Sequence, residues 1–168
     1  AFAIWDKTKQ KTIICRDRYG IKPLYYSECE NGTTFSSEIK SIIKFESFNF
    51  KINKNSLFRH LIYLWNPGNE TMFKTVKRVN PGEKITIVNG RVVSKNQFYN
   101  KNRKINLNKN NDVSEWKKIV KNKIRNAVHN QMISDAKLGS FLSGGLDSST
   151  IVYFAKQINP KLECFTIK

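Results

Sequence analysis

Residues 143–149, read as SGGLDSS, stand between two apolar runs whose patterns differ. The run before them, KLGSFL (137–142), is typical of a short buried strand, and the run after them, TIVYFAKQI (150–158), has the apolar spacing of a helix. We expect that helix to bury the residues of one face: Ile151, Val152, Ala155 and Ile158. The closing LECFTIK (162–168) is typical of another strand. Strand, loop, helix and strand within about 30 residues predict a βαβ unit, and hence the start of an α/β domain with a parallel sheet.

The SGGLDSS loop has the composition of a phosphate site. Its adjacent glycines, Gly144 and Gly145, allow a sharp turn that gathers backbone N–H groups at the positive end of the following helix. Hydroxyl donors stand on either side of them: Ser143, Ser148 and Ser149. Asp147 would repel a bare phosphate, so its carboxylate favours a nucleotide whose phosphates are bridged by Mg²⁺. The alternative interpretation is a Gly-Gly turn in which an Asp or Ser is an ordinary helix N-cap.

The residues before this unit predict an α+β fold. Three hairpins are expected, from the strand-like pairs 2–6 with 11–18, 24–29 with 32–37, and 83–88 with 91–99. The second and third have Asn-Gly turns, at 31–32 and 89–90, which are the strongest short-range hairpin signal. Helices are expected at 38–44, after a Ser cap, and at 53–65, where Pro67 and Gly68 end the pattern.

A polar segment separates the two parts. Residues 99–111 are charged, rich in Asn and nearly free of an apolar pattern, which predicts a linker. Apolar residues then recur at helical spacing from Val113 to Val128, which predicts an amphipathic helix over 112–132. We therefore expect two domains, 1–105 and 106–168, the second including the linker, and neither looks complete.

Composition narrows the class of protein. Of the 168 residues, 39% are hydrophobic and no apolar run approaches the length of a membrane span, so we expect a globular chain without a membrane partner. The net charge of +17 invites a nucleic-acid interpretation. We expect no nucleic-acid partner, because Lys greatly outnumbers Arg and no aromatic–basic stacking platform is present. Three widely spaced cysteines predict neither a zinc site nor a disulfide framework and fit a reducing cytoplasm.

Several motifs together resemble one family. RDRYGIKPLYY (16–26), FSSEIK (35–40), NPGE (80–83) and SGGLDSS occur in the order found in glutamine-hydrolysing asparagine synthetases. The first motif alone would also suit an amidophosphoribosyltransferase, and the loop alone an NAD or argininosuccinate synthetase. The combination resembles the C-terminal part of a class II glutaminase domain, an α+β fold of the N-terminal-nucleophile type, followed by the start of an ATP-pyrophosphatase domain.

The resemblance implies a carbon–nitrogen ligase. In that family glutamine is hydrolysed in one domain, ammonia crosses a tunnel, and aspartate is adenylated by Mg-ATP in the other before ammonia displaces AMP. It implies ATP, Mg²⁺, glutamine and aspartate as ligands, a cytoplasmic location and a candidate homodimer. It places pyrophosphate and metal contacts at Ser143, Gly144, Gly145, Asp147 and Ser148, with Ser149 in the same loop, Asp147 being the Mg²⁺ ligand. It places the adenine and ribose against Phe141, Leu142 and Ile167, and makes Lys22 and Phe141 candidate tunnel residues.

The sequence departs from the family pattern in the catalytic residues that it lacks and at Lys168. The family's nucleophilic cysteine would precede position 1 and its remaining adenylation residues would follow Lys168, so no catalytic residue is assigned and the fragment alone is expected to be inactive. Lys168 stands where the family usually shows Gly.

Other candidate groups are interpreted as structural residues. Cys15 and Cys29 are expected to be small strand residues, and His60 and His129 to be structural helix residues. Residues 16–18 are expected to form a charged turn rather than a catalytic cluster.

Two other functional classes remain open at this point. One is a related amidotransferase acting on another carboxylate, such as a surface-polysaccharide sugar or a β-lactam precursor. The other is a non-enzymatic basic binding module.

Overall fold

The computed structural model describes residues 1–45, 51–99 and 112–167, in two compact units, Ala1–Lys104 and Ile105–Lys168. The predicted linker, apart from Tyr99, and the predicted domain boundary lie outside the described residues, as does Lys168. Each unit is described by itself. None of the helices in the described ranges combines the length and apolar character that crossing a membrane requires.

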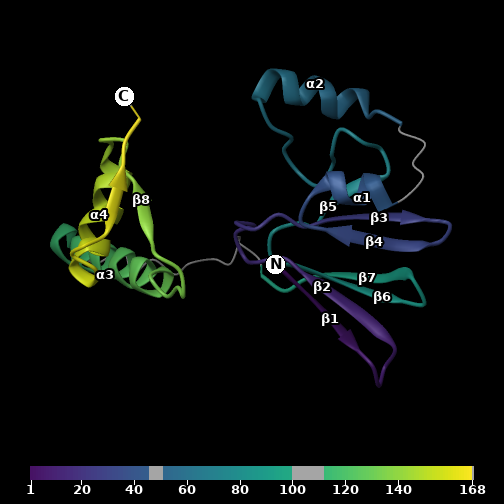
Figure 1. The fold of residues 1–168 in the computed structure, drawn as a ribbon, viewed down its shortest axis with the longest axis horizontal. Helices are drawn as coiled ribbons and strands as arrows, with labels where there is room; N and C mark the ends of the chain where they lie inside the picture. Colours follow the sequence, from purple (N-terminus) through teal and green to yellow (C-terminus); the bar gives the residue numbers. More distant parts are fainter. Residues whose placement is uncertain (46–50, 100–111, 168) are drawn as a thin grey trace. The chain divides into compact units, whose positions relative to one another are not determined.

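The first unit is a stack of two antiparallel sheets covered on one side by helices (Figure 1). One sheet has the strand order β1-β2-β6-β7, from Phe2–Asp6, Lys11–Cys15, Glu83–Val88 and Arg91–Gln97. The other has the order β4-β3-β5, from Gly32–Ser36, Tyr25–Cys29 and Val76–Arg78. Helices α1 (Ile39–Phe45) and α2 (Lys54–Tyr63) lie on the side of the second sheet that faces away from the first.

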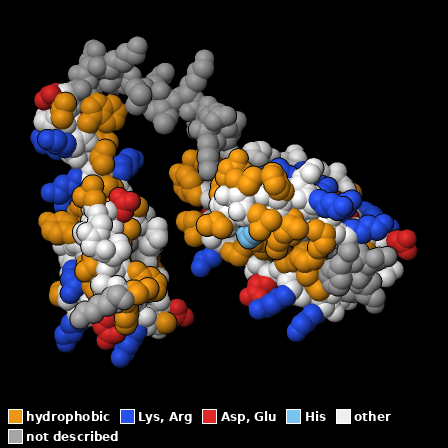
Figure 2. Space-filling model, turned by 90° about the horizontal axis from the view of Figure 1, so that it is seen from above, with side chains coloured by type: hydrophobic (Ala, Val, Ile, Leu, Met, Phe, Trp, Pro, Cys, Tyr) orange, Lys and Arg blue, Asp and Glu red, His pale blue; other side chains and the backbone are white. Residues whose placement is uncertain are grey.

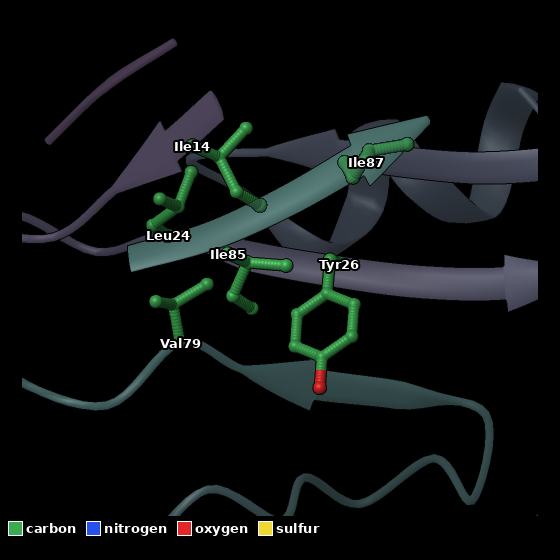
Figure 3. Packing of buried hydrophobic residues seen from close by; sticks show 6 residues of the cluster. All are labelled: Ile14, Leu24, Tyr26, Val79, Ile85 and Ile87. Atoms are coloured by element: carbon green, nitrogen blue, oxygen red, sulfur yellow. The ribbon is translucent and has the colours of Figure 1, made fainter. Parts of the chain in front are cut away.

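The core of this unit lies between the sheets. Side chains from both sheets and from the segments that flank β3 and β5 meet there (Figure 3): Ile14, Leu24, Tyr26, Val79, Ile85 and Ile87. Ile14, Val79 and Ile85 have no exposed surface, and each such side chain contributes about 1.5–3 kcal/mol by leaving water. This burial explains the alternation of apolar and polar residues along β6.

The two Asn-Gly hairpins not only form but meet at their tips. The Thr33 hydroxyl donates to the Gly90 carbonyl at 2.7 Å. The Arg91 guanidinium donates to the carbonyls of Cys29 and Glu30 at 2.7 and 2.8 Å. The tips therefore join the two sheets at one end of the sandwich.

Two details of the first unit differ from the sequence expectation, and a third feature is the exposure of α2. Helix α2 ends at Tyr63 rather than at residue 65, because Leu64 adopts a left-handed conformation with φ of 58°. The short strand β5 was not predicted, because VKR is too short and too polar to stand out and forms only by pairing with β3. The apolar side chains of α2 stay exposed, among them Phe58 at 64% and Leu61 at 69%, and Figure 2 shows hydrophobic side chains gathered on the face of this unit that carries α2.

The second unit contains the predicted βαβ arrangement. Helix α3 (Val113–Gln131) is followed by β8 (Gly139–Phe141), α4 (Leu146–Ile158) and β9 (Glu163–Phe165). β8 and β9 pair in parallel with Gly139 opposite Glu163, which confirms the start of a parallel sheet.

Two burial predictions for this unit are wrong. Strand β8 is not buried, since Phe141 is 78% exposed and, among the described strands, β8 pairs only with β9. Helix α4 buries Val152, Phe154 and Ala155, whereas Ile151 and Ile158 are nearly half exposed. The buried face is shifted because α4 packs on α3, with the Arg125 guanidinium 5.6 Å from the centre of the Phe154 ring.

Candidate functional site

The SGGLDSS loop lies at the carboxyl ends of the two parallel strands. The Leu142 N–H donates to the Phe165 carbonyl at 2.8 Å, and the Thr166 hydroxyl donates to the Leu142 carbonyl at 2.7 Å. These bonds hold the residues that follow β8 and β9 side by side. Ligands of open α/β sheets bind at this edge, so the loop stands where a nucleotide site is expected.

Ser148 organises the loop from within. Its hydroxyl accepts from the Ser143 N–H at 3.3 Å and donates to the Gly145 carbonyl at 3.2 Å. The Ser143 and Ser148 hydroxyl oxygens are 3.0 Å apart, so the two side chains are hydrogen-bonded across the loop. The first helical bond of α4 runs from the Ser149 N–H to the Gly145 carbonyl at 3.1 Å.

The N-terminus of α4 has no side-chain cap. Its N-cap residue is Gly145, which has no side chain to offer, and within the described residues no side-chain cap hydrogen bond is made there. The interpretation of Asp or Ser as an ordinary N-cap is therefore wrong, because Asp147 lies inside the first turn and its side chain is exposed. The N–H groups of an uncapped first turn, together with the positive end of the helix dipole, make this N-terminus a candidate anion site.

The glycines leave open space at this N-terminus. Gly144 has a φ of +81°, which an L side chain rarely adopts, and a Cβ built on it would meet nothing within 4 Å. A Cβ on Gly145 would meet only the Ser143 hydroxyl, at 3.6 Å. The space beside the backbone of Gly144 and Gly145 is thus open to a ligand.

The donor set fits Mg²⁺ only in company with phosphate. Among the described residues no group of three or more His, Cys, Asp or Glu side chains could hold a metal ion by itself. Asp147 supplies one exposed carboxylate, and Mg²⁺ at nucleotide sites is commonly held by one or two carboxylates, phosphate oxygens and water. The loop therefore suits a metal that arrives with a nucleotide or pyrophosphate.

The residues expected near the adenine and ribose lie at the same edge. Phe141 ends β8 and is 78% exposed, Leu142 is half-buried, and Ile167, two residues after β9, is 92% exposed. Ser149 is exposed in the first turn of α4. Of the two candidate tunnel residues, Lys22 lies in the first unit and Phe141 in the second, and the tunnel stays a prediction.

A mainly apolar pocket of about 620 Å³ lies beside the loop in the second unit. It is lined by side chains of α3, α4 and the segments around β8, including Ile124, Leu138 and Ile151. Leu146 and Asp147 of the loop are also among its lining residues. This mainly apolar lining does not suit a triphosphate, so the N-terminus of α4 remains the candidate anion site.

Residues 16–18 take part in a hydrogen-bonded turn, as the sequence predicts. The Arg16 guanidinium donates to the carbonyls of Lys22, Val79 and Gly20 at 3.0, 2.8 and 2.7 Å. Burial lowers the pKa of Arg16 below its usual value, and the nearby Arg78 lowers it further. These bonds tie the turn to its own backbone and to the segment after β5.

Asp17 complements Arg16 in the same turn. Its carboxylate accepts from the N–H groups of Tyr19, Ile21 and Lys22 at 3.0–3.1 Å. Desolvation, the largest single contribution, raises the pKa of Asp17, but the backbone N–H groups together outweigh it and lower the pKa to about 2.

The cysteines and histidines are where the sequence predicts them. Cys15 is buried at the end of β2, and Cys29 ends β3, where its thiol donates to the Gly32 carbonyl at 3.1 Å. His60 lies on α2 and His129 on α3.

Family models match both units of the chain. The model described as the glutamine amidotransferase domain matches residues 1–99, and the model described as asparagine synthase matches residues 120–168. The order of the two matches is the order in which the motifs occur.

Curated relatives match nearly the whole chain. Asparagine synthetase [glutamine-hydrolyzing] 1 of Bacillus subtilis is 35% identical over 99% of this chain and 26% of its own length. Putative asparagine synthetase [glutamine-hydrolyzing] 2 of Methanocaldococcus jannaschii is 32% identical over 99% of this chain and 33% of its own. Amidase chry2 of Gibberella zeae is 29% identical over 90% of this chain and 22% of its own. The chain thus spans about a quarter to a third of the asparagine synthetases it matches, and it belongs to the family of glutamine-hydrolysing asparagine synthetases, with a glutamine amidotransferase part followed by the start of an asparagine synthase part.

Proposed function

We propose that this chain is part of a glutamine-dependent asparagine synthetase. Glutamine is hydrolysed to glutamate and ammonia, the aspartate side-chain carboxylate attacks the α-phosphorus of ATP and releases pyrophosphate, and ammonia then displaces AMP to give asparagine. Aspartate is proposed as the acceptor because the relatives of greatest identity cited above bear the name asparagine synthetase. The protein is further proposed to be cytoplasmic and homodimeric, with no nucleic-acid partner.

The observation that carries this proposal is the uncapped N-terminus of α4 at the SGGLDSS loop. The N–H groups of its first turn would hold the β- and γ-phosphates of ATP as the leaving pyrophosphate, together with the neighbouring hydroxyls of Ser143 and Ser148, whose oxygens are 3.0 Å apart. Asp147 would hold Mg²⁺ against those phosphates. When bound, the ion neutralises charge that builds up on the leaving group.

The neighbouring residues would orient the rest of the nucleotide. Phe141 and Ile167 present exposed apolar surface at the strand ends, and the Leu142 backbone is fixed by its bonds to Phe165 and Thr166. This arrangement supports the placement of the adenine and ribose there, with the α-phosphorus directed to the acceptor carboxylate.

The chain itself allows a direct test by calorimetric titration with pyrophosphate. In the presence of Mg²⁺ we expect wild type to bind pyrophosphate more tightly than without the ion, because Asp147 and the phosphates share it. Asp147→Asn should lose this dependence on Mg²⁺. Asp135→Asn removes one exposed carboxylate from the same unit outside the loop, so it serves as the charge-matched control and should retain the dependence.

Binding driven only by the net charge of +17 would respond alike to both substitutions. An equal dependence on Mg²⁺ in wild type, Asp147→Asn and Asp135→Asn would contradict the assignment of Asp147.

A further inference from the structure

Three segments that are far apart in the sequence meet just after β7, at the last described residues of the first unit. The N–H groups of Phe98 and Tyr99 both donate to the Gly82 carbonyl, at 2.9 and 3.3 Å. The Gln97 side-chain amide donates to the carbonyls of Pro81 and Tyr99 at 2.6 and 2.9 Å. The end of β7 is thereby attached to the turn of the NPGE motif.

The Tyr99 ring is held by the RDRYG motif. The rings of Tyr19 and Tyr99 meet edge to face with centres 5.8 Å apart, and their hydroxyl oxygens are 3.3 Å apart. The Arg18 guanidinium carbon lies 5.7 Å from the centre of the Tyr99 ring. The ring separation of 5.8 Å is typical of an attractive aromatic pair, and the guanidinium distance of 5.7 Å is typical of a cation–π contact. We call Arg18, Tyr19, Gly82 and Tyr99 the exit clasp.

The parts that support the exit clasp are fixed. The Asp17 carbonyl accepts from the N–H groups of Gly20 and Gly82 at 3.1 and 2.8 Å, while its carboxylate accepts from the turn. Gly82 has a φ of +70°, and a Cβ on it would lie 2.9 Å from the Cβ and carbonyl oxygen of Tyr99. The glycine therefore lets the end of the unit approach closely.

The exit clasp sits at a boundary that the comparisons also mark. The match to the glutamine amidotransferase domain ends at residue 99, and the match to asparagine synthase begins at residue 120. Tyr99 is thus the last residue of the first match, and the residues between the two matches follow it in the chain. Arg18 and Tyr19 are exposed, so their contacts with Tyr99 bury little apolar surface compared with the core between the sheets.

We propose that the exit clasp is a positioning element that couples glutamine hydrolysis to amide synthesis by fixing where the chain leaves the glutaminase domain. This proposal rests on the proposed function, in which ammonia made in one domain is consumed in the other. Tyr99 touches no substrate in this account and acts through the placement of the connection. Loosening it should release ammonia to solvent while each half-reaction continues.

The test uses the protein extended to the length of its relatives, with Tyr99→Ala, Tyr99→Phe and a control, Tyr63→Ala. Tyr63 is an exposed tyrosine on α2, outside the clasp and the proposed sites. Glutamate and asparagine are measured in parallel with glutamine as nitrogen source, and pyrophosphate release is measured with ammonium instead. In Tyr99→Ala we expect the glutamate-to-asparagine ratio to rise about fivefold or more, the lower end of coupling between sites, at unchanged rates with ammonium. Tyr99→Phe keeps the ring and the cation–π contact and should stay near wild type, as should Tyr63→Ala.

Each other outcome decides against the proposal in a recognisable way. An unchanged ratio in Tyr99→Ala would overturn the coupling role while leaving the proposed function intact. Loss of both half-reactions in Tyr99→Ala would show a merely structural role and also overturn it. Absence of glutamine-dependent asparagine formation in wild type would contradict the proposed function, and the clasp's coupling role would fall with it.

Discussion

The Nη1 atom of Arg16 lies 2.8 Å from the carbonyl oxygen of Val79 and donates a hydrogen bond that spans 63 positions of the chain. The guanidinium also donates to Lys22 and Gly20 in its own turn, and Arg16 is only 8% exposed. One side chain thus satisfies three carbonyls and joins the RDRYG turn to the segment that precedes NPGE. A planar fork of donors is required for this, which only arginine supplies.

Replacing Arg16 should destabilise the first unit. In Arg16→Ala the three carbonyls lose their donor, and we expect the free energy of unfolding to fall by about 2–4 kcal/mol. Arg16→Lys keeps the charge but not the fork, so it should recover only part of that loss. Denaturant unfolding followed by fluorescence measures both; a lysine variant as stable as wild type would show that the charge alone suffices.

Asp17 should make the first unit sensitive to acid. The folded state keeps this carboxyl ionised down to a pKa of about 2, whereas its ordinary value is 3.8. Between these values the unfolded chain binds more protons, so the stability from Asp17 is fully present above about pH 4 and is lost as the pH falls toward 2. Asp17→Asn should therefore flatten the fall in stability over this window, measured as unfolding midpoints from pH 5 to 2. The control is Asp6→Asn. The Asp6 carboxylate accepts a hydrogen bond from the Lys9 N–H, and this substitution should leave the slope of stability against pH closer to wild type.

The glycine of the RDRYG turn should tolerate no side chain. Gly20 has a φ of +68°, and a Cβ there would lie 2.8 Å from Pro81 and 3.0 Å from the Arg16 guanidinium carbon. Gly68 is the matched control, because its φ is +80° but a Cβ would meet nothing within 4 Å. We expect Gly68→Ala to cost about 1–2 kcal/mol from the backbone alone and Gly20→Ala about 2–5 kcal/mol from backbone and clash together. Equal losses in thermal unfolding would remove the role assigned to close packing at Gly20.

How far the sequence predicts this structure depends on how local the signal is. The hairpins at 31–32 and 89–90 and the Asn53 cap of α2 follow from a few adjacent residues, and the structure contains them. The SGGLDSS loop is also local, and its place at the strand ends follows from the βαβ pattern.

The features that the sequence does not predict depend on residues far apart in the chain. Strand β5 exists through its pairing with β3, and the buried face of α4 is set by α3. Tyr99 was expected at the start of the linker, yet it is held by residues about eighty and seventeen positions away. The local signal was weak: two aromatic residues, Phe98 and Tyr99, follow the polar run SKNQ at the end of β7.

The basic charge should act without sequence preference. With a net charge of +17 the chain is expected to bind duplex DNA weakly, with a dissociation constant above roughly 1 µM at physiological salt, and to lose that binding steeply as salt rises. Fluorescence anisotropy with two unrelated duplexes and a tRNA measures this. Tight binding at physiological salt, or a preference among the three, would show that the charge serves a nucleic-acid partner.

The most direct measurement of the central claim is the parallel assay of pyrophosphate and glutamate in Asp147→Asn, made in the protein extended to the length of its relatives. The loop of Asp147 belongs to the second unit, whereas glutamine hydrolysis is proposed for the first. We expect glutamate release to persist and ATP-dependent pyrophosphate release to fall by about 10²-fold or more, the effect of losing one preorganised charge-stabilising group. Pyrophosphate release near the wild-type rate in Asp147→Asn would contradict the assignment of this loop as the Mg-pyrophosphate site.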